Sequence, residues 1–440
     1  MTATGSSDRR VAITGLGVVS PLGNSVDTMW NAMLNGQSGV APLQLLPPLE
    51  GVVHFGGEAN EFTGAIDNFG ELPKDKKKAI RKALKVMCRE TMMAVSAAQQ
   101  AVADAGVAES PIDPERSGVV FGSDYMLSPP EDFTDGMVKC GVSDEGFHYD
   151  QWGQDGLREM NPLWMLKYLP NMPGSHIAIF NDLRGPNNSL TLREIAGVMA
   201  IREAAQTIAR GHADRMIAGS TGTRIHSFKT IHATQTEQLA DPNLEPSVAC
   251  RPFDASRTGM VVGEGAGAII LEHLDTAIAR GATVYAEVVG SGSSTVTDSN
   301  LNGNPTEAMA NAAKAALADA GIDPEQMGHV NAHGLGTTEG DANEAKALAK
   351  ALGESASHVP VAAAKSYFGN LGAASGVVEL IASAKALHEQ KLFRTLNFET
   401  PDAACPLAIA AEDDIAPGNS FLKLSVTPQA QAAAVVVRGL

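Results

Sequence analysis

The sequence predicts an α/β protein built from two duplicated halves. The Ala-rich segment AAQQAVADAG at residues 97–106 recurs as AAKAALADAG at residues 312–321, and each copy ends in a glycine suited to a left-handed helix C-terminus. Both copies lead through Ile-Asp-Pro-Glu into an apolar strand, at residues 117–123 and 328–334. Because helix, cap, turn and strand coincide in order, we interpret the match as an internal duplication. Strands that alternate with helices at this spacing indicate α/β units on mostly parallel sheets.

Further strands are predicted from short runs rich in β-branched residues, separated by Gly-rich turns. They lie at residues 10–20, 176–181, 215–221, 265–273, 283–294 and 434–438. We divide the chain into an N-terminal half, residues 1–264, and a C-terminal half, residues 265–440. Residues 125–170 hold two of the three tryptophans and interrupt the alternation of strand and helix, so we expect an insertion or a lid there.

Composition and charge exclude several classes of protein. The chain of 440 residues is long enough for two or three fused units with sizeable cores, and its 44% hydrophobic residues exclude disorder. A formal net charge of −17 opposes nucleic-acid binding, which depends on Lys and Arg neutralising phosphates. The sequence contains no run of ~18 apolar residues and starts without an apolar secretory segment, so we expect a cytoplasmic protein with no membrane partner.

Neither a metal nor a nucleotide cofactor is expected. The cysteines are far apart and fit no metal-binding or disulfide framework: Cys88, Cys140, Cys250 and Cys405. The GxG pattern at Gly15 and Gly17 lacks the third glycine of a dinucleotide-binding fingerprint, and no suitably placed acidic residue follows a βαβ unit.

One segment is strongly basic although the chain as a whole is acidic. Between Lys74 and Lys85 the sequence KDKKKAIRKALK also places Ile80, Ala83 and Leu84 on one apolar helical stripe, which Met87 continues. One interpretation is a solvated helix face with its stripe on the core. The other is a docking surface for a small acidic protein, because opposite local potential steers encounter. The candidate docking residues are Lys74, Lys76, Lys77, Lys78, Arg81, Lys82 and Lys85.

Six segments carry a resemblance to a known family. They are RVAITGLGVVSPLGN (10–24), RGPNNSLTLREIAGVMAIREAAQTIARG (184–211), RPFDASRTGMVVGEGAG (251–267), NAHGLGTTEGDANEAKALA (331–349), KSYFGNLGAASGVVEL (365–380) and LNFETPD (396–402). In this order they resemble the β-ketoacyl-acyl-carrier-protein synthases of the thiolase-like superfamily, which include type II ketosynthases and chain-length factors. The resemblance implies the thiolase-like five-layered αβαβα fold, usually dimeric. It also implies acyl carrier protein as partner, with its phosphopantetheine arm carrying the substrate and no other cofactor.

The resemblance also assigns a site, in which the nucleophile is changed. The family's catalytic Cys, His and His correspond here to Glu194, His333 and Asn370, while Lys365 and Glu344 match positions that support the histidines. A carboxylate can be acylated only to a labile mixed anhydride, so acyl transfer through Glu194 is not expected. Two interpretations stay open for Glu194. It is either a helix N-terminal charge paired with Lys365, His333 or Arg193, or a general base acting on a thioester.

A second departure lies near the C-terminus. The family reads NSFGFGGTN, where glycines let the backbone approach the acyl thioester and a Phe gates the tunnel. This chain reads NSFLKLSVTPQ at residues 419–429 and has no glycine there. Side chains at Leu422, Lys423 and Leu424 must then be accommodated. We expect an altered or plugged acyl pocket.

Three functions remain open from the sequence. The first is a non-condensing homologue in fatty acid or polyketide biosynthesis that pairs with an active ketosynthase, as chain-length factors do, although these usually carry Gln at the nucleophile position. The second is an enzyme that acts on malonyl- or acyl-carrier-protein thioesters without a covalent intermediate, as a decarboxylase or thioesterase, through Glu194, His333 and Asn370. The third is a carrier-protein-binding scaffold. Under each of them the chain is expected to form a homodimer or a heterodimer with an active ketosynthase.

Overall fold

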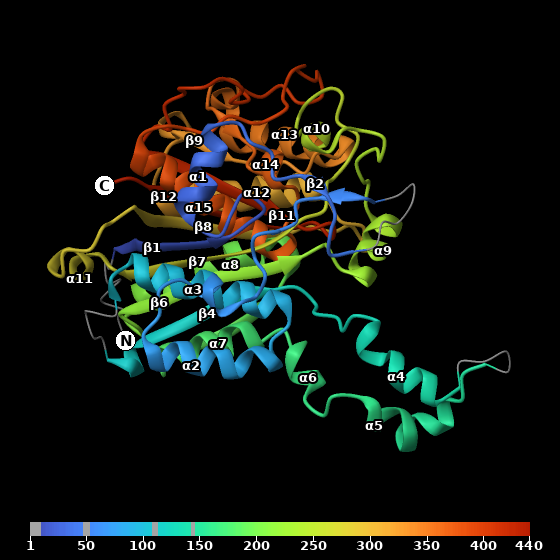
Figure 1. Cartoon of the computed structure of the whole chain (residues 1–440). Helices are drawn as coiled ribbons and strands as arrows, with labels where there is room; N and C mark the ends of the chain where they lie inside the picture. The colour runs from blue at the N-terminus through green and yellow to red at the C-terminus, as the bar shows by residue number, and fades with distance from the viewer. Residues whose placement is uncertain (1–9, 47–52, 108–112, 142–145) are drawn as a thin grey trace.

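The chain folds around a ten-stranded mixed sheet that consists of two equivalent halves (Figure 1). The structure is a computed structural model that describes residues 10–46, 53–107, 113–141 and 146–440. The first half-sheet has the order β5-β4-β6-β7-β1 and the second the order β10-β9-β11-β12-β8. Their strands are β1 (Val11–Val19), β4 (Ser117–Ser123), β5 (Asn187–Thr191), β6 (Arg215–Thr223), β7 (Glu264–His273), β8 (Ala286–Thr295), β9 (His329–Asn331), β10 (Val361–Ala362), β11 (Ser420–Val426) and β12 (Gln431–Arg438). A separate ribbon pairs β2 (Ala41–Pro42) with β3 (Phe55–Gly56).

The strand directions repeat between the halves and confirm the duplication. In the first half β4 pairs parallel with β5 and β6, and in the second β9 pairs parallel with β10 and β11. All other pairs of this sheet are antiparallel, including β1 with β8, which joins the halves through residues 11–13 and 286–288. The expectation of mostly parallel sheets was therefore wrong for the inner strands, because β7 in the first half and β12 in the second run antiparallel to both of their neighbours.

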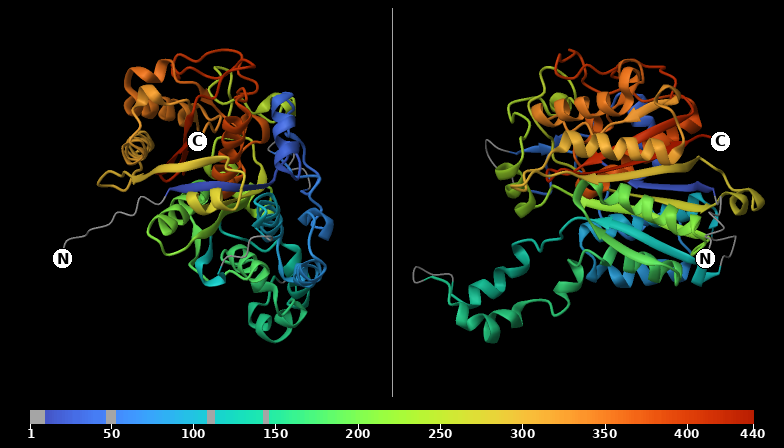
Figure 2. Two further views of the ribbon diagram at one scale, coloured as in Figure 1. Left: turned by 90° about the vertical axis from the view of Figure 1, so that its left-hand side faces the viewer. Right: turned by 180° about the vertical axis from the view of Figure 1, so that it is seen from behind.

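The helices form three layers around the two half-sheets. They are α1 (Val26–Leu34), α2 (Lys74–Ala83), α3 (Arg89–Asp104), α4 (Glu131–Lys139), α5 (Leu157–Glu159), α6 (Trp164–Lys167), α7 (Met172–Asn181), α8 (Ala196–Ala209), α9 (Ser227–Thr236), α10 (Pro246–Ala249), α11 (Leu274–Ala279), α12 (Pro305–Ala320), α13 (Thr338–Leu352), α14 (Lys365–Phe368) and α15 (Ser375–Glu389). Helix α3 packs on β1 and β7 outside the first half-sheet, and α12 packs on β8 and β12 outside the second. Helices α8 and α15 contact strands of both halves and lie between them. This arrangement, seen from two further sides in Figure 2, is the expected five-layered fold.

The glycines of the GxG pattern have a packing role that the duplication repeats. A Cβ on Gly17 would lie 2.0 Å from the carbonyl oxygen of Ala97, and a Cβ on Gly292 would lie 2.2 Å from that of Ala312. Ala97 and Ala312 are the first residues of the two repeated segments. A side chain at either glycine would therefore push the Ala-rich helix off its strand, which explains why small residues recur on both sides of the contact.

Residues 176–181, expected to form a strand, belong to helix α7. A short apolar run suits either element, and here Pro173 occupies the first turn of a helix. Ile177 and Ala178 are buried while Ile179 is exposed, a pattern of helical burial, and α7 packs against α3 and β4. The other expected strands are found, and residues 420–426, where no strand was expected, form β11 between β9 and β12.

Residues 125–141 and 146–170 project from the body as an arm, with α4, α5 and α6 along it (Figures 1 and 2). The proposed division of the chain after residue 264 falls on the first residue of β7, which pairs with β6 and β1. The strand order therefore favours a division between β7 and β8. Among the described residues, no helix is long and apolar enough to cross a membrane.

Candidate active site

Glu194 lies at a strained turn that leads into the central helix α8. Arg193 has a φ of 52°, in the left-handed region that costs a non-glycine residue about 1–3 kcal/mol. The turn directs the side chain of Glu194 into the interior, and Glu194 is only 1% exposed to solvent. The expected position at a helix N-terminus is therefore confirmed, since residues 193–195 form a single turn directly before α8.

Two arginines, and not Lys365, hold the Glu194 carboxylate. Its Oε1 is ion-paired with Nη2 of Arg224, which is fully buried, and its Oε2 lies 3.5 Å from Nε of Arg193. Glu237 binds the same two guanidinium groups, at 3.0 Å from Arg193 and 3.5 Å from Arg224. Burial alone would raise the pKa of Glu194, but the charges of Arg224 and Arg193 outweigh it and lower the pKa below its usual value. Glu194 is therefore an anion in a buried four-residue network.

His333 is neutral and fixed by its neighbours. Nζ of Lys365 lies 3.3 Å from Nδ1 of His333 and donates to its carbonyl oxygen at 2.7 Å. Because an ammonium group only donates, Nδ1 is the acceptor and the ring proton is assigned to Nε2. Burial, followed by the charges of Lys365 and Lys423, holds the pKa of His333 well below its usual value. Glu344 accepts hydrogen bonds from the backbone N–H groups of His333 at 2.6 Å and Gly334 at 2.8 Å, which holds this loop in place.

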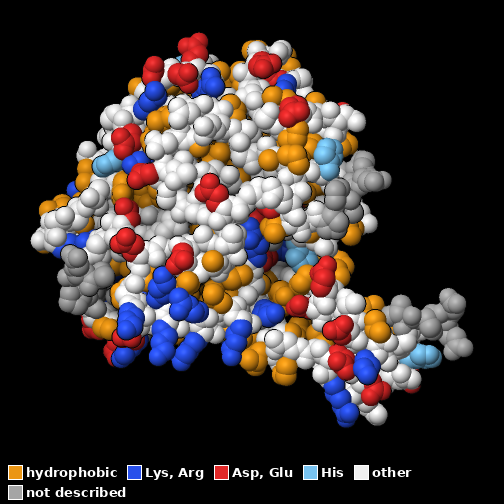
Figure 3. All heavy atoms as spheres, viewed as in Figure 1, with side chains coloured by type: hydrophobic (Ala, Val, Ile, Leu, Met, Phe, Trp, Pro, Cys, Tyr) orange, Lys and Arg blue, Asp and Glu red, His pale blue; other side chains and the backbone are white. Residues whose placement is uncertain are grey.

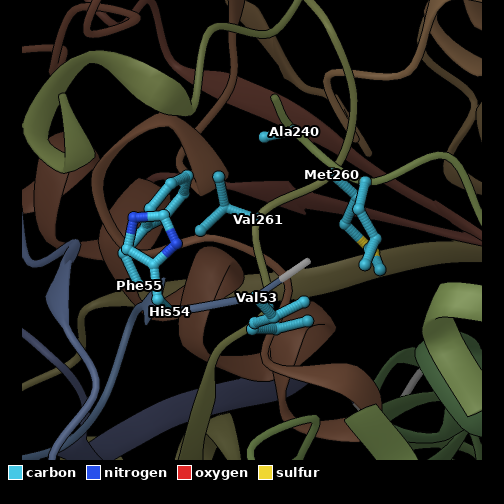
Figure 4. A pocket seen from close by; sticks show the side chains of 8 residues that line it. Val53, His54, Phe55, Ala240, Met260 and Val261 are labelled. Carbon is cyan, nitrogen blue, oxygen red and sulfur yellow. The ribbon is translucent and has the colours of Figure 1, made fainter. Parts of the chain in front are cut away.

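The side-chain amide of Asn370 is not free to donate a hydrogen bond to a ligand beside His333. Its Nδ2 lies 3.5 Å from Oε1 of Glu194 and 3.0 Å from Sδ of Met260, while its Oδ1 accepts from the backbone N–H of Gly372 and from Ser375. The amide is therefore engaged on both sides within the protein. Figure 4 shows Met260 on the wall of a small, largely apolar cavity beside β3. Of the residues that line this cavity, only His54 has a side chain suited to catalysis.

The altered C-terminal segment introduces a buried lysine. Lys423 on β11 is fully buried and ion-paired with Oε2 of Glu379, and its Nζ also donates to the carbonyl oxygen of Ala332 at 3.0 Å. Lys365 lies 2.8 Å from Oε1 of the same Glu379. Leu422 and Leu424 point into the core of the second half. These residues thus belong to a packed strand, and burial lowers the pKa of Lys423.

None of the four cysteines lines the cavity that contains Glu194 and His333. All four are free and buried, and Sγ of Cys250 donates to the carbonyl oxygen of Lys365 at 3.0 Å. Burial raises the pKa of Cys88 and of Cys250 to about 12 and that of Cys405 to about 11, so these thiols stay protonated near neutral pH.

A cavity of about 380 Å³ connects several of these residues. Glu194, Glu237 and His333 lie on its wall together with Leu335 and Thr337. Of the five expected site residues, Glu194 and His333 face this cavity, whereas Asn370, Lys365 and Glu344 support it from behind. The sequence interpretation missed Arg224, Glu237 and Glu379. Arg224 directly follows the buried strand β6 and Glu379 lies within the apolar helix α15, and a charge in such a place was the available signal for these two.

The basic segment forms α2, with its apolar stripe on the core as expected. Ile80 and Met87 are buried, and Ala83 and Leu84 pack against the same cluster. Lys76 donates to Asn181 at 2.9 Å and Lys77 is paired with Asp67 at 2.8 Å, so the freely exposed basic residues are Lys74, Lys78, Arg81, Lys82 and Lys85. Figure 3 shows Lys and Arg side chains gathered along the lower face that α2 occupies in Figure 1.

Known proteins resemble the chain over nearly its whole length. The β-ketoacyl synthase N-terminal domain matches residues 8–277 and the C-terminal domain residues 285–399. The 3-oxoacyl-[acyl-carrier-protein] synthase 2 of Staphylococcus aureus (strain COL) is 34% identical over 411 residues, 93% of this chain and 92% of that protein.

Solved structures agree with this match. A ketosynthase bound to a hexaketide, in complex with its type II polyketide synthase acyl-carrier protein, is 27% identical with a TM-score of 0.81, and the match covers 99% of this chain and 100% of that one. The ishigamide ketosynthase/chain length factor shares the fold at a TM-score of 0.80 and 24% identity, over 99% of this chain and 100% of that one. With both domains matched in order and the five-layered fold present, the chain belongs to the β-ketoacyl synthase family.

Proposed function

We propose that this chain is a non-condensing β-ketoacyl-acyl-carrier-protein synthase homologue that acts as the partner subunit of an active ketosynthase, in the manner of a chain-length factor. The observation that carries the proposal is the buried ion pair of Glu194 with Arg224 at the end of the turn where the family has its Cys. A carboxylate held by two guanidinium groups is a poor nucleophile, and its acylation would produce a labile anhydride.

The decarboxylase alternative receives less support from the geometry. Stabilising an enolate needs donors aimed at the developing oxyanion. His333 lies on the cavity wall, but the amide of Asn370 is engaged with Glu194 and Met260. The anion of Glu194 would also repel a malonyl carboxylate. A thioesterase using Glu194 as base is opposed by its lowered pKa, since a weak base activates water poorly.

Pairing with another synthase subunit is supported by an open sheet edge and the apolar arm. Strand β5 is the last strand of the first half-sheet, and its outer edge has no partner among the described strands. Eight large hydrophobic side chains are exposed on the arm: Met137, Val138, Phe147, Tyr149, Leu157, Leu163, Met165 and Leu166. Figure 3 shows hydrophobic side chains on the surface of the arm. An open edge and an apolar arm are surfaces that a second subunit would cover.

Carrier-protein binding is supported by the exposed face of α2. Lys74, Lys78 and Lys82 are spaced four residues apart and therefore lie on one side of the helix. This cationic face on an acidic protein suits an acidic carrier, and a ketosynthase of the same fold has been solved in complex with its acyl-carrier protein. Charge reversal by Lys78→Glu with Lys82→Glu is expected to weaken carrier binding at least tenfold. The same double reversal at the exposed Lys314 on α12 and Lys346 on α13 is the matched control, and equal effects would contradict docking on α2.

The catalytic part of the proposal is tested by intact-mass analysis. Malonyl- and acyl-carrier proteins are incubated with the wild type and with Glu194→Ala and His333→Ala, and both protein and carrier are weighed. We expect no acyl adduct on the chain, no condensation product and an unchanged carrier. Loss of carbon dioxide that depends on His333 would establish a decarboxylase, and loss of the acyl group that depends on Glu194 would establish a hydrolase.

The pairing part is tested by co-expression with a ketosynthase from the same organism. We expect a heterodimer by native mass spectrometry, which Leu163→Asp with Met165→Asp on the arm dissociates. Leu301→Asp removes a still more exposed apolar residue, 82% exposed, from a loop outside the arm and is expected to leave the heterodimer intact. A stable homodimer that binds no ketosynthase would refute the chain-length-factor role.

A further inference from the structure

A second cavity, of about 630 Å³, lies beside the junction of the two half-sheets. Its wall combines the C-terminal half of α8, the start of β1, the first half of β8 and the ends of α12 and β12. Among the described residues, none lines both this cavity and the one beside Glu194. An α-helix rises about 1.5 Å per residue, so Arg202 on this wall lies about 12 Å from Glu194 along the helix axis. The cavity is therefore a separate site.

The guanidinium group of Arg202 has no partner in the part of the chain that the structure describes. It makes no hydrogen bond and no ion pair there, although Arg202 is only partly exposed and its Nε is buried. The terminal nitrogens Nη1 and Nη2 are not buried in this way, so the end of the side chain is open to the cavity that it lines. A cation that has lost part of its hydration without gaining a carboxylate is costly, and a bound anion would remove that cost.

Both carboxylates on the wall of this cavity are already engaged. Glu287 is buried and accepts hydrogen bonds from Nε and Nη2 of Arg10, at 2.8 and 2.7 Å, and from Nη2 of Arg438 at 3.2 Å. Asp319 accepts from the backbone N–H of Ser291 at 2.9 Å. With Arg202, three arginines face two carboxylates, so this wall has an excess of one positive charge on a chain whose formal net charge is −17.

The available donors favour a ligand with several anionic oxygens. A guanidinium group has five N–H donors in a planar fork, and Arg10 and Arg438 use only some of theirs on Glu287. Such forks match pairs of phosphate oxygens. The rest of the wall is mainly apolar, through Val11, Ala205, Ala209, Val288, Val289 and Ala320. A cavity of this size with a few convergent charged groups on an apolar wall is typical of a small-molecule site.

We propose that this cavity binds a diphosphate group, with Arg202 as its main ligand and the free N–H groups of Arg10 and Arg438 as further donors. The group is either a free pyrophosphate ion or the diphosphate of a nucleotide, whose base packs on the apolar wall. The inference is independent of carrier binding. Because the wall contains strands of both halves, an occupied site stabilises the folded chain.

The test is calorimetric titration of the full chain with pyrophosphate and with ADP, without divalent metal, at two ionic strengths. We expect saturable binding of one ligand per chain that weakens with added salt. Tighter binding of ADP identifies a nucleotide as the ligand, and equal or weaker binding of ADP identifies the free ion. Arg202→Met should weaken binding about tenfold or more, and Arg202→Lys, which keeps the charge without the fork, should weaken it less.

The matched control is Arg210→Met, which removes the same charge from an exposed residue directly after α8 and outside the cavity. It should change the affinity less than about twofold. Since Arg202 has no partner to lose, Arg202→Met should melt at or above the wild-type Tm without ligand. Pyrophosphate should raise the Tm of the wild type and of Arg210→Met, but not that of Arg202→Met.

Three results would overturn the proposal. The first is the absence of saturable binding of either ligand to the wild type. The second is equal weakening in Arg202→Met and Arg210→Met, which would show a general charge effect. The third is an Arg202→Met variant that melts below the wild type without ligand, because the guanidinium would then be stabilised within the chain itself.

Discussion

The buried pair of Glu194 and Arg224 predicts a large and non-additive stability effect. Glu194→Gln keeps the shape of the side chain but leaves the fully buried guanidinium of Arg224 with one carboxylate partner, Glu237 at 3.5 Å. Breaking a buried pair from one side costs about 3–5 kcal/mol, and the remaining partner argues for the lower end, about 3 kcal/mol. Arg224→Met is expected to cost a similar amount, because it leaves Glu194 with Arg193 alone.

The size of the effect can be converted into a melting temperature. With an unfolding entropy of about 2.1 cal/mol/K per residue, a chain of 440 residues loses about 1 °C of Tm for each 1 kcal/mol. Each single variant should therefore melt about 3 °C below the wild type in differential scanning calorimetry. The double variant Glu194→Met with Arg224→Met removes both charges and should recover most of this loss.

A matched control is the exposed ion pair of Lys350 with Glu307, for which single substitutions should shift Tm by less than about 1 °C. The reasoning would be refuted if Glu194→Gln melted with the wild type, or if the double variant lost the sum of the single losses. Either result would mean that water, and not the opposite charge of the partner, stabilises the Glu194 carboxylate and the Arg224 guanidinium.

Three further outcomes follow from the same networks. The pKa of Glu194 is lowered from about 4.5, so its contribution to the free energy of unfolding is complete above that pH and is lost as the pH falls further. The Tm difference between wild type and Glu194→Gln should therefore shrink below about pH 4.5. A constant difference would contradict this expectation. Glu379→Gln should lower Tm more than Lys423→Met, because it leaves two buried ammonium groups without a carboxylate; the opposite order would show that Glu379 is not the shared partner. Glu194→Cys should not restore condensation in a carrier-protein elongation assay, because Asn370 stands where the family has a second His; product formation would show that the thiol alone was missing.

The fold was largely predictable because its signals are local and repeated. The two Ala-rich helices, their glycine caps and the strands that follow could be read directly, and the packing of Gly17 on Ala97 explains why they recur. Residues 176–181 were misassigned because a short apolar run does not distinguish strand from helix. The antiparallel inner strands could not be derived from spacing, since direction depends on how distant segments pair.

The site was predicted in its residue types but not in its partners. Motif positions identified Glu194 and His333, and both line one cavity. The partner of Glu194 was expected to be Lys365, His333 or Arg193, yet Arg224, which lies 30 residues later in the chain, makes its closest contact. Sequence spacing carries no information about such long-range charge pairs. For Lys423 the sequence likewise predicted only that a large side chain must be accommodated. It did not predict the buried ion pair with Glu379 that the structure shows.

Retention of the family's catalytic motifs does not by itself indicate catalysis in this chain. Lys365 donates to the carbonyl oxygen of His333 and pairs with Glu379, and Glu344 accepts from the backbone of the same loop. Removing any of these groups would leave a buried charge or a buried backbone N–H group without a partner, at a cost of several kcal/mol for a charge and about 1–3 kcal/mol for a hydrogen bond. Selection for a stable fold is therefore enough to preserve these residues, with or without catalysis. Glu194 itself has acquired its own buried partners, so reversing that one substitution would disturb the network before it could restore the chemistry.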